Sequence, residues 1–462
     1  MDKNGMRPLK DMRALRWIVL ISLSLPMFAS YFFDDIYSVI SEQFINPENV
    51  ALGWSMADYG FFRSAYSLLC IFGGLIICGI MLDRWGVRFT GSLFVGLMVF
   101  GAAVIVYAVS ESFAGSAFYT WIGGFSEKPS LTLAYAGCAM FGLGSEIAGV
   151  AVNRAISKWF KGKEIALAMG MQLALARLGT AVAIVSIPRL VDLDGYIPYA
   201  VTSKPASIGF AILLAGLFLW SLFVFMDFSS DRRDRAIASS SGEAVPGDKD
   251  RFRFSDVLKV ITDRNFILIA LLCVFFYCCV ISFRKFATAI LMPRFGIDSD
   301  VASWMVAMIP FFTLVFAPLF GAMVDRVGRG TKIMILGSSL ILAAHLAVAF
   351  APSVKLFGFV SIAVLGIGYS LVPAAMWPSI PKIIPENKLG TAFSLMYWVQ
   401  NIGLFLTPIV VGNIIEKADS PVAAEYFFIA LAVLAVTVSV MLSKASDRQP
   451  ELRLDEKAGG KH

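Results

Sequence analysis

Several charged residues lie inside long apolar stretches of the 462-residue sequence, and three of them are the first candidates for a site: Asp35, Glu146 and Arg177. A charge at the centre of a membrane helix costs about 2.5–3.5 kcal/mol on an insertion scale, so each needs a partner or a task. A buried carboxylate such as Glu146 can bind an ammonium group, and the planar guanidinium of Arg177 can hold a carboxylate through two parallel hydrogen bonds. Together they would suit a small zwitterionic solute. The alternative is a structural ion pair between two helices.

Further polar residues could line the same site. Tyr31 shares a segment with Asp35, which could bind an amino group or carry a proton; the alternative is a solvated helix end. Arg284 could be a second contact for an anionic group or could lie at the membrane interface. Polar residues later in the chain could form a second wall or simply hydrogen-bond between helices; they are Tyr369, Tyr397 and Asn401.

Other chemistries find no support in the residue types. The sequence has two histidines, His345 inside an apolar segment and His462 at its end, which argues against histidine catalysis and histidine-ligated metals. The six cysteines lie in apolar stretches without zinc-like spacing and are expected to be small buried side chains. No GxxxxGK[ST], GxSxG or HExxH motif occurs. We therefore expect no enzyme activity, no metal site and no cofactor.

The composition is that of a protein that crosses a membrane many times. Hydrophobic residues make up 58% and charged residues 16% of the chain, whereas soluble domains have about 45–50% and about 25%. A spanning helix needs about 20 mostly apolar residues. The expected fold class is all-α, with twelve membrane helices. The windows that meet the requirement are 17–40, 57–82, 89–109, 131–157, 165–190, 206–228, 264–293, 299–324, 331–350, 354–380, 389–413 and 422–443.

The distribution of basic residues predicts the orientation. The net charge of +6 does not come from a basic soluble domain that would bind nucleic acid, because most Lys and Arg residues lie in the loops of one side. The positive-inside rule then places both termini in the cytoplasm. The polar stretch between the sixth and seventh windows is expected to link two six-helix halves. The predicted parts are an N-terminal segment 1–16, a first half 17–228, a linker 229–260, a second half 261–443 and a cytoplasmic tail 444–462.

A short motif recurs at corresponding places in the two halves. GIMLDRWGVR at 79–88 is matched by GAMVDRVGRG at 321–330. Parallel six-helix repeats build one large class of secondary transporters, with the substrate site near the midplane. The motif aspartate can face the positive N-terminus of another helix and the arginines can pair with carboxylates, which would close a gate. The alternative is a simple tight turn at the glycine. The predicted gate residues are Asp83, Arg84, Arg88, Asp325 and Arg326.

The repeated G-x-x-x-D-R-x-G resembles the signature loop of the major facilitator superfamily. The segment NRAISKWFKGKEIALAMGMQLALARLGTA at 153–181 resembles, more closely, the lysosomal dipeptide uniporters of this superfamily and their bacterial relatives. This resemblance extends over most of 20–190 through SYFFDD, FGG…LDRWGVR and GSE. It implies dipeptide substrates moved by facilitated diffusion, with Glu146 and Arg177 as site residues. The run SFRKFA at 282–287 departs from the family pattern, which leaves the C-terminal part of the site less defined.

The sequence thus predicts a secondary transporter that works by alternating access and moves a small zwitterionic solute, foremost a dipeptide, as a uniporter. The alternative is a proton-coupled carrier of small organic anions, with Glu146 or Asp35 protonated in the empty state because burial disfavours a carboxylate. The expected partners are the substrate and the lipid bilayer, for a single subunit; whether an accessory subunit exists stays open. The lack of Asn-X-Ser/Thr sites favours a bacterial cytoplasmic membrane.

Overall fold

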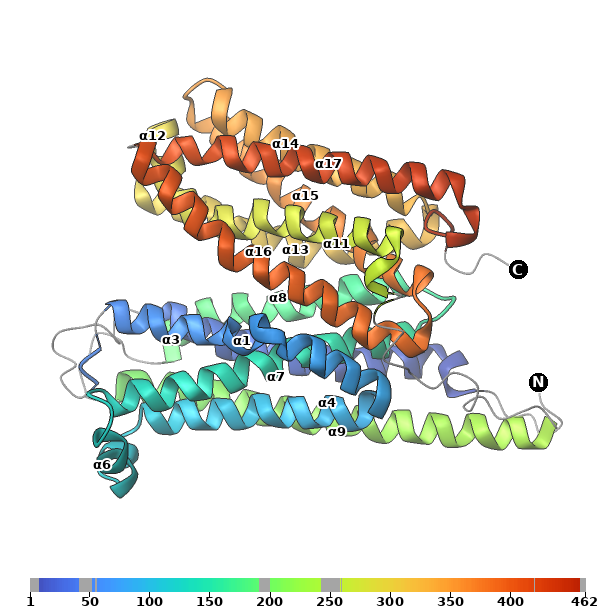
Figure 1. The fold of residues 1–462 in the computed structure, drawn as a ribbon, viewed down its shortest axis with the longest axis horizontal. Helices are drawn as coiled ribbons and strands as arrows, with labels where there is room; N and C mark the ends of the chain where they lie inside the picture. Colours follow the sequence, from blue (N-terminus) through green and yellow to red (C-terminus); the bar gives the residue numbers. More distant parts are fainter. Residues whose placement is uncertain are drawn as a thin grey trace. The chain divides into compact units, whose positions relative to one another are not determined.

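The structure, a computed structural model, describes residues 8–40, 52–54, 56–190, 200–241, 258, 260–418 and 420–457. Within these ranges every regular element is a helix (Figure 1). Eleven helical stretches among them are long and apolar enough to cross a membrane. The all-α expectation is thus confirmed, whereas the number of twelve spans and the side on which the termini lie stay predictions.

The longest of these stretches, Asp58–Ala108, has 51 residues and contains two of the predicted windows. Gly86 of the first motif copy interrupts it with a φ of 81°, a backbone conformation that glycine adopts without steric cost. Across this bend the hydroxyl of Thr90 donates to the carbonyl of Met81 at 3.0 Å. The chain therefore turns at the motif glycine. The elements of the stretch are α3 (Met56–Leu69), the π-helical turn η2 (Cys70–Gly74) and α4 (Leu75–Ala108).

The described chain divides into two compact units. Unit 1 contains residues up to Val152 and from Leu175 to α9, and unit 2 contains Asn153–Ala174 with everything from α11 onwards. In unit 1, α9 packs against both α1 and α4. The remaining helices that contribute to unit 1 are α1 (Arg13–Val39), α5 (Glu111–Ala114), α6 (Ala117–Gly123), α7 (Pro129–Trp159), α8 (Ile165–Leu190) and α9 (Ala200–Ser241).

The start of the predicted linker is helical. α9 continues through 229–241, and the rest of the predicted linker, apart from residues 258 and 260, lies outside the described residues. Ion pairs hold this extension to unit 1: Arg88 lies 3.2 Å from Asp231, and Lys10 lies 3.1 Å from Asp234. The domain boundaries themselves stay predictions.

Unit 2 is built around α14, which packs on α15 and α17, while α13 packs on the other side of α15. A second π-helical turn, η3 (Cys278–Ser282), separates α11 from α12. The six cysteines of the chain are all buried and free, as expected. The helices of unit 2 are α11 (Arg264–Tyr277), α12 (Phe283–Phe295), α13 (Ser299–Val327), α14 (Gly330–Phe350), α15 (Lys355–Ile383), α16 (Leu389–Ala418) and α17 (Ala424–Arg448).

Candidate functional site

Four helices of unit 1 bring together a group of half-buried polar residues, here called the polar cluster. α1 supplies two of them, and α3, α7 and α8 supply one each. The contacts described below join Tyr66 to Glu146, and Arg177 to Tyr31 and Asp35. The cluster contains three of the sequence-predicted candidates for a charged site and the two tyrosines next to them. Its members are Tyr31, Asp35, Tyr66, Glu146 and Arg177.

Glu146 is held by a tyrosine from the neighbouring helix. The hydroxyl of Tyr66 lies 3.1 Å from Oε1 of Glu146 and 3.2 Å from Oγ of Ser145. Ser145 in turn shares a hydrogen bond of 2.6 Å with Ser30 of α1. A Cβ at Gly142 would collide with the backbone of Tyr66, so the glycine is what allows α7 to approach α3 this closely. The close approach therefore places the Tyr66 hydroxyl against the carboxylate.

Arg177 lies over an aromatic ring of α1. Its guanidinium carbon is 4.8 Å from the centroid of the Tyr31 ring, within the range of a cation–π interaction. One turn further along α8, the hydroxyl of Thr180 donates to Oδ2 of Asp35 at 2.6 Å, and the charges of Asp35 and Arg177 interact. The planar face of the guanidinium is thus occupied by Tyr31, while its N–H groups point from its edge. A guanidinium edge of this kind has the planar geometry that matches a carboxylate.

The two consecutive aspartates of α1 have different surroundings. Asp34 forms an ion pair with Arg63 of α3, with 2.8 Å between Oδ1 and the guanidinium nitrogen. Asp35 instead accepts from Thr180 of α8. Arg63 is therefore paired locally with α1. Of the two carboxylates, Asp35 is the one that belongs to the polar cluster.

The sequence pattern missed Tyr66, although a signal was present. Tyr59, Arg63 and Tyr66 follow at a spacing of four and three residues in an otherwise apolar helix, which places them on one face. In the structure this face of α3 contacts other helices of unit 1. The hydroxyl of Tyr59, for example, donates to the carbonyl of Tyr37 in α1 at 2.7 Å. A polar stripe of this kind in a membrane helix indicates a protein-facing surface.

We expect Tyr66→Phe to weaken binding of the solute that Glu146 recognises. The change removes the hydroxyl that orients the carboxylate and leaves the ring and the helix packing in place. A lost hydrogen bond to a charged group corresponds to about 1–2 kcal/mol, or roughly 5- to 30-fold in apparent affinity. The measurement is the concentration dependence of transport in liposomes. The matched control is Tyr59→Phe on the same face of α3, which should leave the affinity unchanged.

In unit 2, two of the predicted residues belong to an aromatic cluster. Tyr369 is buried and lies 6.4 Å, edge to face, from Tyr277, whose hydroxyl accepts a hydrogen bond of 3.0 Å from Nε1 of Trp377. Trp377 lies 5.2 Å from the ring of Tyr397. The amide of Asn153 donates to the hydroxyl of Tyr397 at 3.3 Å. The structure therefore joins Tyr369 and Tyr397 through Tyr277 and Trp377.

Two further candidates of unit 2 have other surroundings. Asn401 is buried, and its amide donates to the carbonyl of Tyr397 at 2.9 Å, one turn back in the same helix. This hydrogen bond occupies one of the two N–H donors of the Asn401 amide. Arg284 lies on a different element, at the start of α12 directly after the π-helical turn η3, and is half-buried.

The second motif copy contacts the beginning of a helix. Asp325 is buried, and its carboxylate accepts from the backbone N–H groups of Ala166 at 3.2 Å and Leu167 at 2.7 Å. These are in the first turn of α8, where the helix dipole favours a negative charge. Beside this contact lies a cavity of about 820 Å³, whose lining includes Asp325 and Lys382. Arg326 is exposed.

The first motif copy is tied to α9 by one of its arginines. Nη1 of Arg88 lies 3.2 Å from Asp231 and 3.8 Å from Asp227, and the guanidinium lies 5.6 Å from the ring of Phe228. Asp83 is half-buried and Arg84 is exposed. Both copies also make a turn at a glycine, since Gly328 has a φ of 71°. The motif therefore combines a turn with charged contacts.

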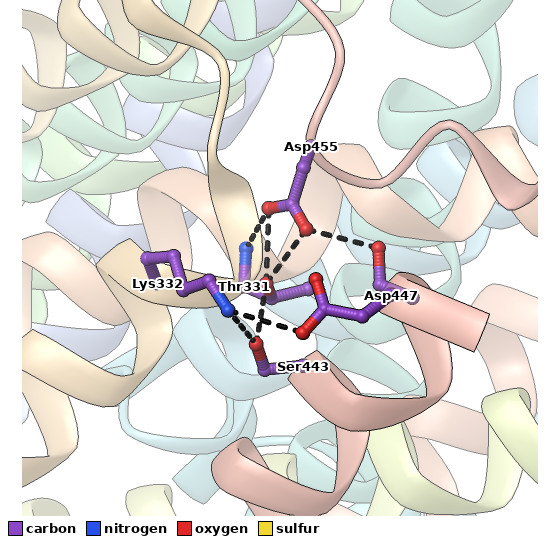
Figure 2. A network of polar contacts seen from close by, with 6 residues as sticks. Thr331, Lys332, Ser443, Asp447 and Asp455 are labelled. Carbon is purple, nitrogen blue, oxygen red and sulfur yellow. Dashed lines mark hydrogen bonds and ion pairs between the residues drawn. The ribbon is translucent and has the colours of Figure 1, made fainter. Parts of the chain in front are cut away.

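The end of the chain folds back onto the second motif loop (Figure 2). The carboxylate of Asp455 accepts from the backbone N–H of Thr331 at 2.8 Å, at the start of α14, and also from the hydroxyl of Ser446 at 2.9 Å. The backbone carbonyl of Asp455 accepts from the N–H of Arg329 at 2.9 Å. Nζ of Lys382 donates to the carbonyl of Leu454 at 3.2 Å. Residues up to 457 of the predicted tail therefore brace this loop.

We expect Asp455→Ala to lower the stability of the protein by about 1–2 kcal/mol, because the start of α14 loses a capping carboxylate. Thermal unfolding in detergent measures the effect. Glu451→Ala removes the same charge from an exposed position of the same tail and serves as the control. Equal unfolding temperatures for the two variants would contradict the capping role.

Comparison with known proteins decides the family. Residues 17–293 and 272–461 match the Major Facilitator Superfamily, which accounts for nearly the whole chain. The chain belongs to the major facilitator superfamily. It is therefore a multi-pass membrane transporter and not an enzyme, as expected from its composition and motifs.

Relatives within the superfamily include transporters of animals. The lysosomal dipeptide transporter MFSD1 of Danio rerio is 28% identical over 439 residues, covering 92% of this chain and 86% of that protein. The lysosomal dipeptide transporter MFSD1 of Homo sapiens is 27% identical over 448 residues, covering 94% and 87%. The resemblance to dipeptide transporters is thereby confirmed along both halves, including the part after residue 190.

Solved structures of the superfamily share the fold at low sequence identity. A bacterial homologue of the iron transporter ferroportin superposes with a TM-score of 0.68 at 14% identity, covering 92% of this chain and 99% of that one. The proton:xylose symporter XylE superposes with a TM-score of 0.65 at 13% identity, covering 93% and 95%. The major facilitator fold follows from these likenesses.

Proposed function

We propose that this transporter moves dipeptides, as a uniporter. The observation that carries the proposal is the presence of a carboxylate and a guanidinium in the polar cluster, Glu146 on α7 and Arg177 on α8, each in contact with a tyrosine. Its relatives are dipeptide transporters at 27–28% identity over most of their length. A zwitterionic solute with separated ammonium and carboxylate groups fits such a pair.

In this proposal Glu146 binds the ammonium group and Arg177 binds the carboxylate. The Tyr66 hydroxyl orients the Glu146 carboxylate by donating to one of its oxygens, and the ammonium group would bind to this carboxylate. Tyr31 covers the face of Arg177, so that the solute carboxylate meets the edge with its parallel N–H groups. Asp35 balances part of the arginine charge when no solute is bound.

Alternating access requires contacts that break in each cycle. We propose that the carboxylate of Asp325 at the first turn of α8 is such a contact, since a helix N-terminus and an aspartate attract each other without covalent or packing constraints. Arg88, with its two carboxylate partners on α9, would hold the first motif copy in shape. Asp83, Arg84 and Arg326 complete the proposed gate.

A second candidate function is proton-coupled transport of small organic anions. Asp35 supports it, because this carboxylate is hydrogen-bonded to a hydroxyl and lies close enough to Arg177 for their charges to interact. Protonation of Asp35 would release Arg177 to bind an anion. The two functions differ in what drives uptake.

Uptake into proteoliposomes tests the proposal. We expect a labelled dipeptide to equilibrate along its own gradient and to exchange with unlabelled dipeptide inside. An imposed pH gradient of either sign should not drive accumulation. Accumulation driven by an acidic outside would contradict the uniporter and support the second candidate, all the more if the solute is a dicarboxylate and Asp35→Asn abolishes the effect.

A further inference from the structure

The connection between α4 and α7 carries a short helix with three exposed aromatic rings. On α6 and just after it, Phe118 is 42% exposed, Trp121 is 65% exposed and Phe125 is 65% exposed. Their spacing of three and four residues places them on one face. Figure 1 shows α6 beside the end of α4, projecting sideways from unit 1. With seven residues, α6 is far too short to cross a membrane.

The exposed rings connect to the lipid-facing surface of α4 through the buried ring of Phe113. Along α4, Leu93, Phe100 and Tyr107 are exposed at intervals of seven residues, the pattern of a stripe that faces lipid. The stripe ends at Tyr107, whose ring lies 5.3 Å from that of Phe113. From Phe113 the ring contacts continue at 6.1 Å to Phe118, at 5.6 Å to Trp121 and at 5.3 Å to Phe125.

Local contacts hold the rings in this position. Ser116 caps α6 by accepting from the N–H of Tyr119 at 3.1 Å, and the buried side chains of Phe113 and Ile122 anchor the segment. At the end of the segment, directly before α7 begins, Lys128 forms an ion pair with Asp58 of α3. The apolar face is therefore presented by a built structure, fixed at both ends.

We propose that α6 lies flat in the membrane–water interface and that its aromatic face inserts among the lipid headgroups. Aromatic rings, tryptophan above all, prefer this layer, where an apolar body meets lipid and the indole N–H meets water. A short helix with a single apolar face binds in the plane of the interface. The lipid surface is the occupant because the neighbouring stripe of α4, which ends in contact with this segment, faces lipid.

Spin labels on neighbouring positions of α6 test the proposal in the full-length protein, reconstituted in phosphatidylcholine and phosphatidylglycerol bilayers. The label is attached at Trp121→Cys or, as the matched control, at Thr120→Cys, about 100° away on the exposed polar side. Collisions with oxygen report the lipid environment, and collisions with a nickel chelate report water. The wild-type protein, whose six cysteines are buried, gives the labelling background.

We expect position 121 to collide more with oxygen than with the nickel chelate, and position 120 to show the reverse. Equal access of the nickel chelate to both positions would overturn the proposal. So would protection of position 121 from both reagents, which would indicate a protein or a second copy on this face. If the labelled variants do not fold, tryptophan fluorescence replaces the spin labels. The contribution of Trp121 is the difference in fluorescence between the wild-type protein and Trp121→Phe. We expect lipids that are brominated near the headgroup to quench this contribution, and the absence of quenching by any brominated lipid would overturn the proposal.

Discussion

Replacing Arg177 by alanine should reduce the affinity for dipeptides by about 10- to 100-fold, the largest effect expected of a single substitution in the polar cluster. A charge-assisted, two-fold hydrogen bond to a carboxylate corresponds to about 1.5–3 kcal/mol. Arg177→Lys should recover only part of the loss, because an ammonium group lacks the planar fork. The measurement is thermal stabilisation of the purified protein by dipeptide, followed by uptake into liposomes. Arg264→Ala, at an exposed helix start, is the control.

Modified dipeptides show which end of the solute Arg177 holds. A dipeptide with an amidated C-terminus lacks the carboxylate and should bind more weakly to the wild-type protein. The Arg177→Ala variant should have the same affinity for this amidated dipeptide as the wild-type protein. Glu146→Gln should in turn make no difference to an N-acetylated dipeptide, which lacks the ammonium group. Full affinity for unmodified dipeptides in both variants would remove Glu146 and Arg177 from the site.

The second large effect concerns the buried pair His345–Glu425 of unit 2. Nδ1 of the histidine lies 2.8 Å from Oε2 of the glutamate, and the side chains are 1% and 0% exposed. The imidazole stacks on Phe428 at 5.5 Å and meets the edge of Phe283 at 5.1 Å. Removing one partner leaves the other polar group alone in a dry interior, which costs about 3–5 kcal/mol. His345→Leu and Glu425→Met should therefore each be strongly destabilising.

The double substitution is expected to restore most of the loss. Two apolar side chains of similar volume can replace a buried pair at little or no cost, since both desolvation penalties disappear together. Unfolding of the single and double variants in detergent gives the coupling free energy from a double-mutant cycle. Lys161→Met, which breaks the exposed pair with Glu386, is the control, with an expected loss of about 0–1 kcal/mol. Additive losses in the double variant would show that the two residues act separately.

His345 also illustrates how far sequence reasoning reached. In the sequence the histidine is isolated within an apolar segment, and Glu425 stands 80 residues away at the start of the last helix. No periodicity relates the two positions. Their contact follows from the packing of α14 against α17 and from the rotation of each helix, which are properties of the folded unit.

The sequence by itself determined the class of protein, the membrane-crossing segments and the charged residues inside them. These features depend on local composition, because a helix must match the membrane with about 20 apolar residues and a buried charge stands out against them. The repeated motif indicated the superfamily. Its glycine also indicated a turn in each copy, and the structure has these turns at Gly86 and Gly328.

Only the tertiary structure decided which partner each charge has. Asp34 and Asp35 are consecutive in the sequence, yet one pairs with Arg63 and the other accepts from Thr180. Tyr66 reaches Glu146 across 80 residues because Gly142 lets two helices approach. Consecutive helix residues point about 100° apart, so the rotation of a helix selects which of them faces the cluster. The partner of each polar side chain thus depends on how segments that are distant in the sequence pack together. Local sequence patterns contain no information about this packing.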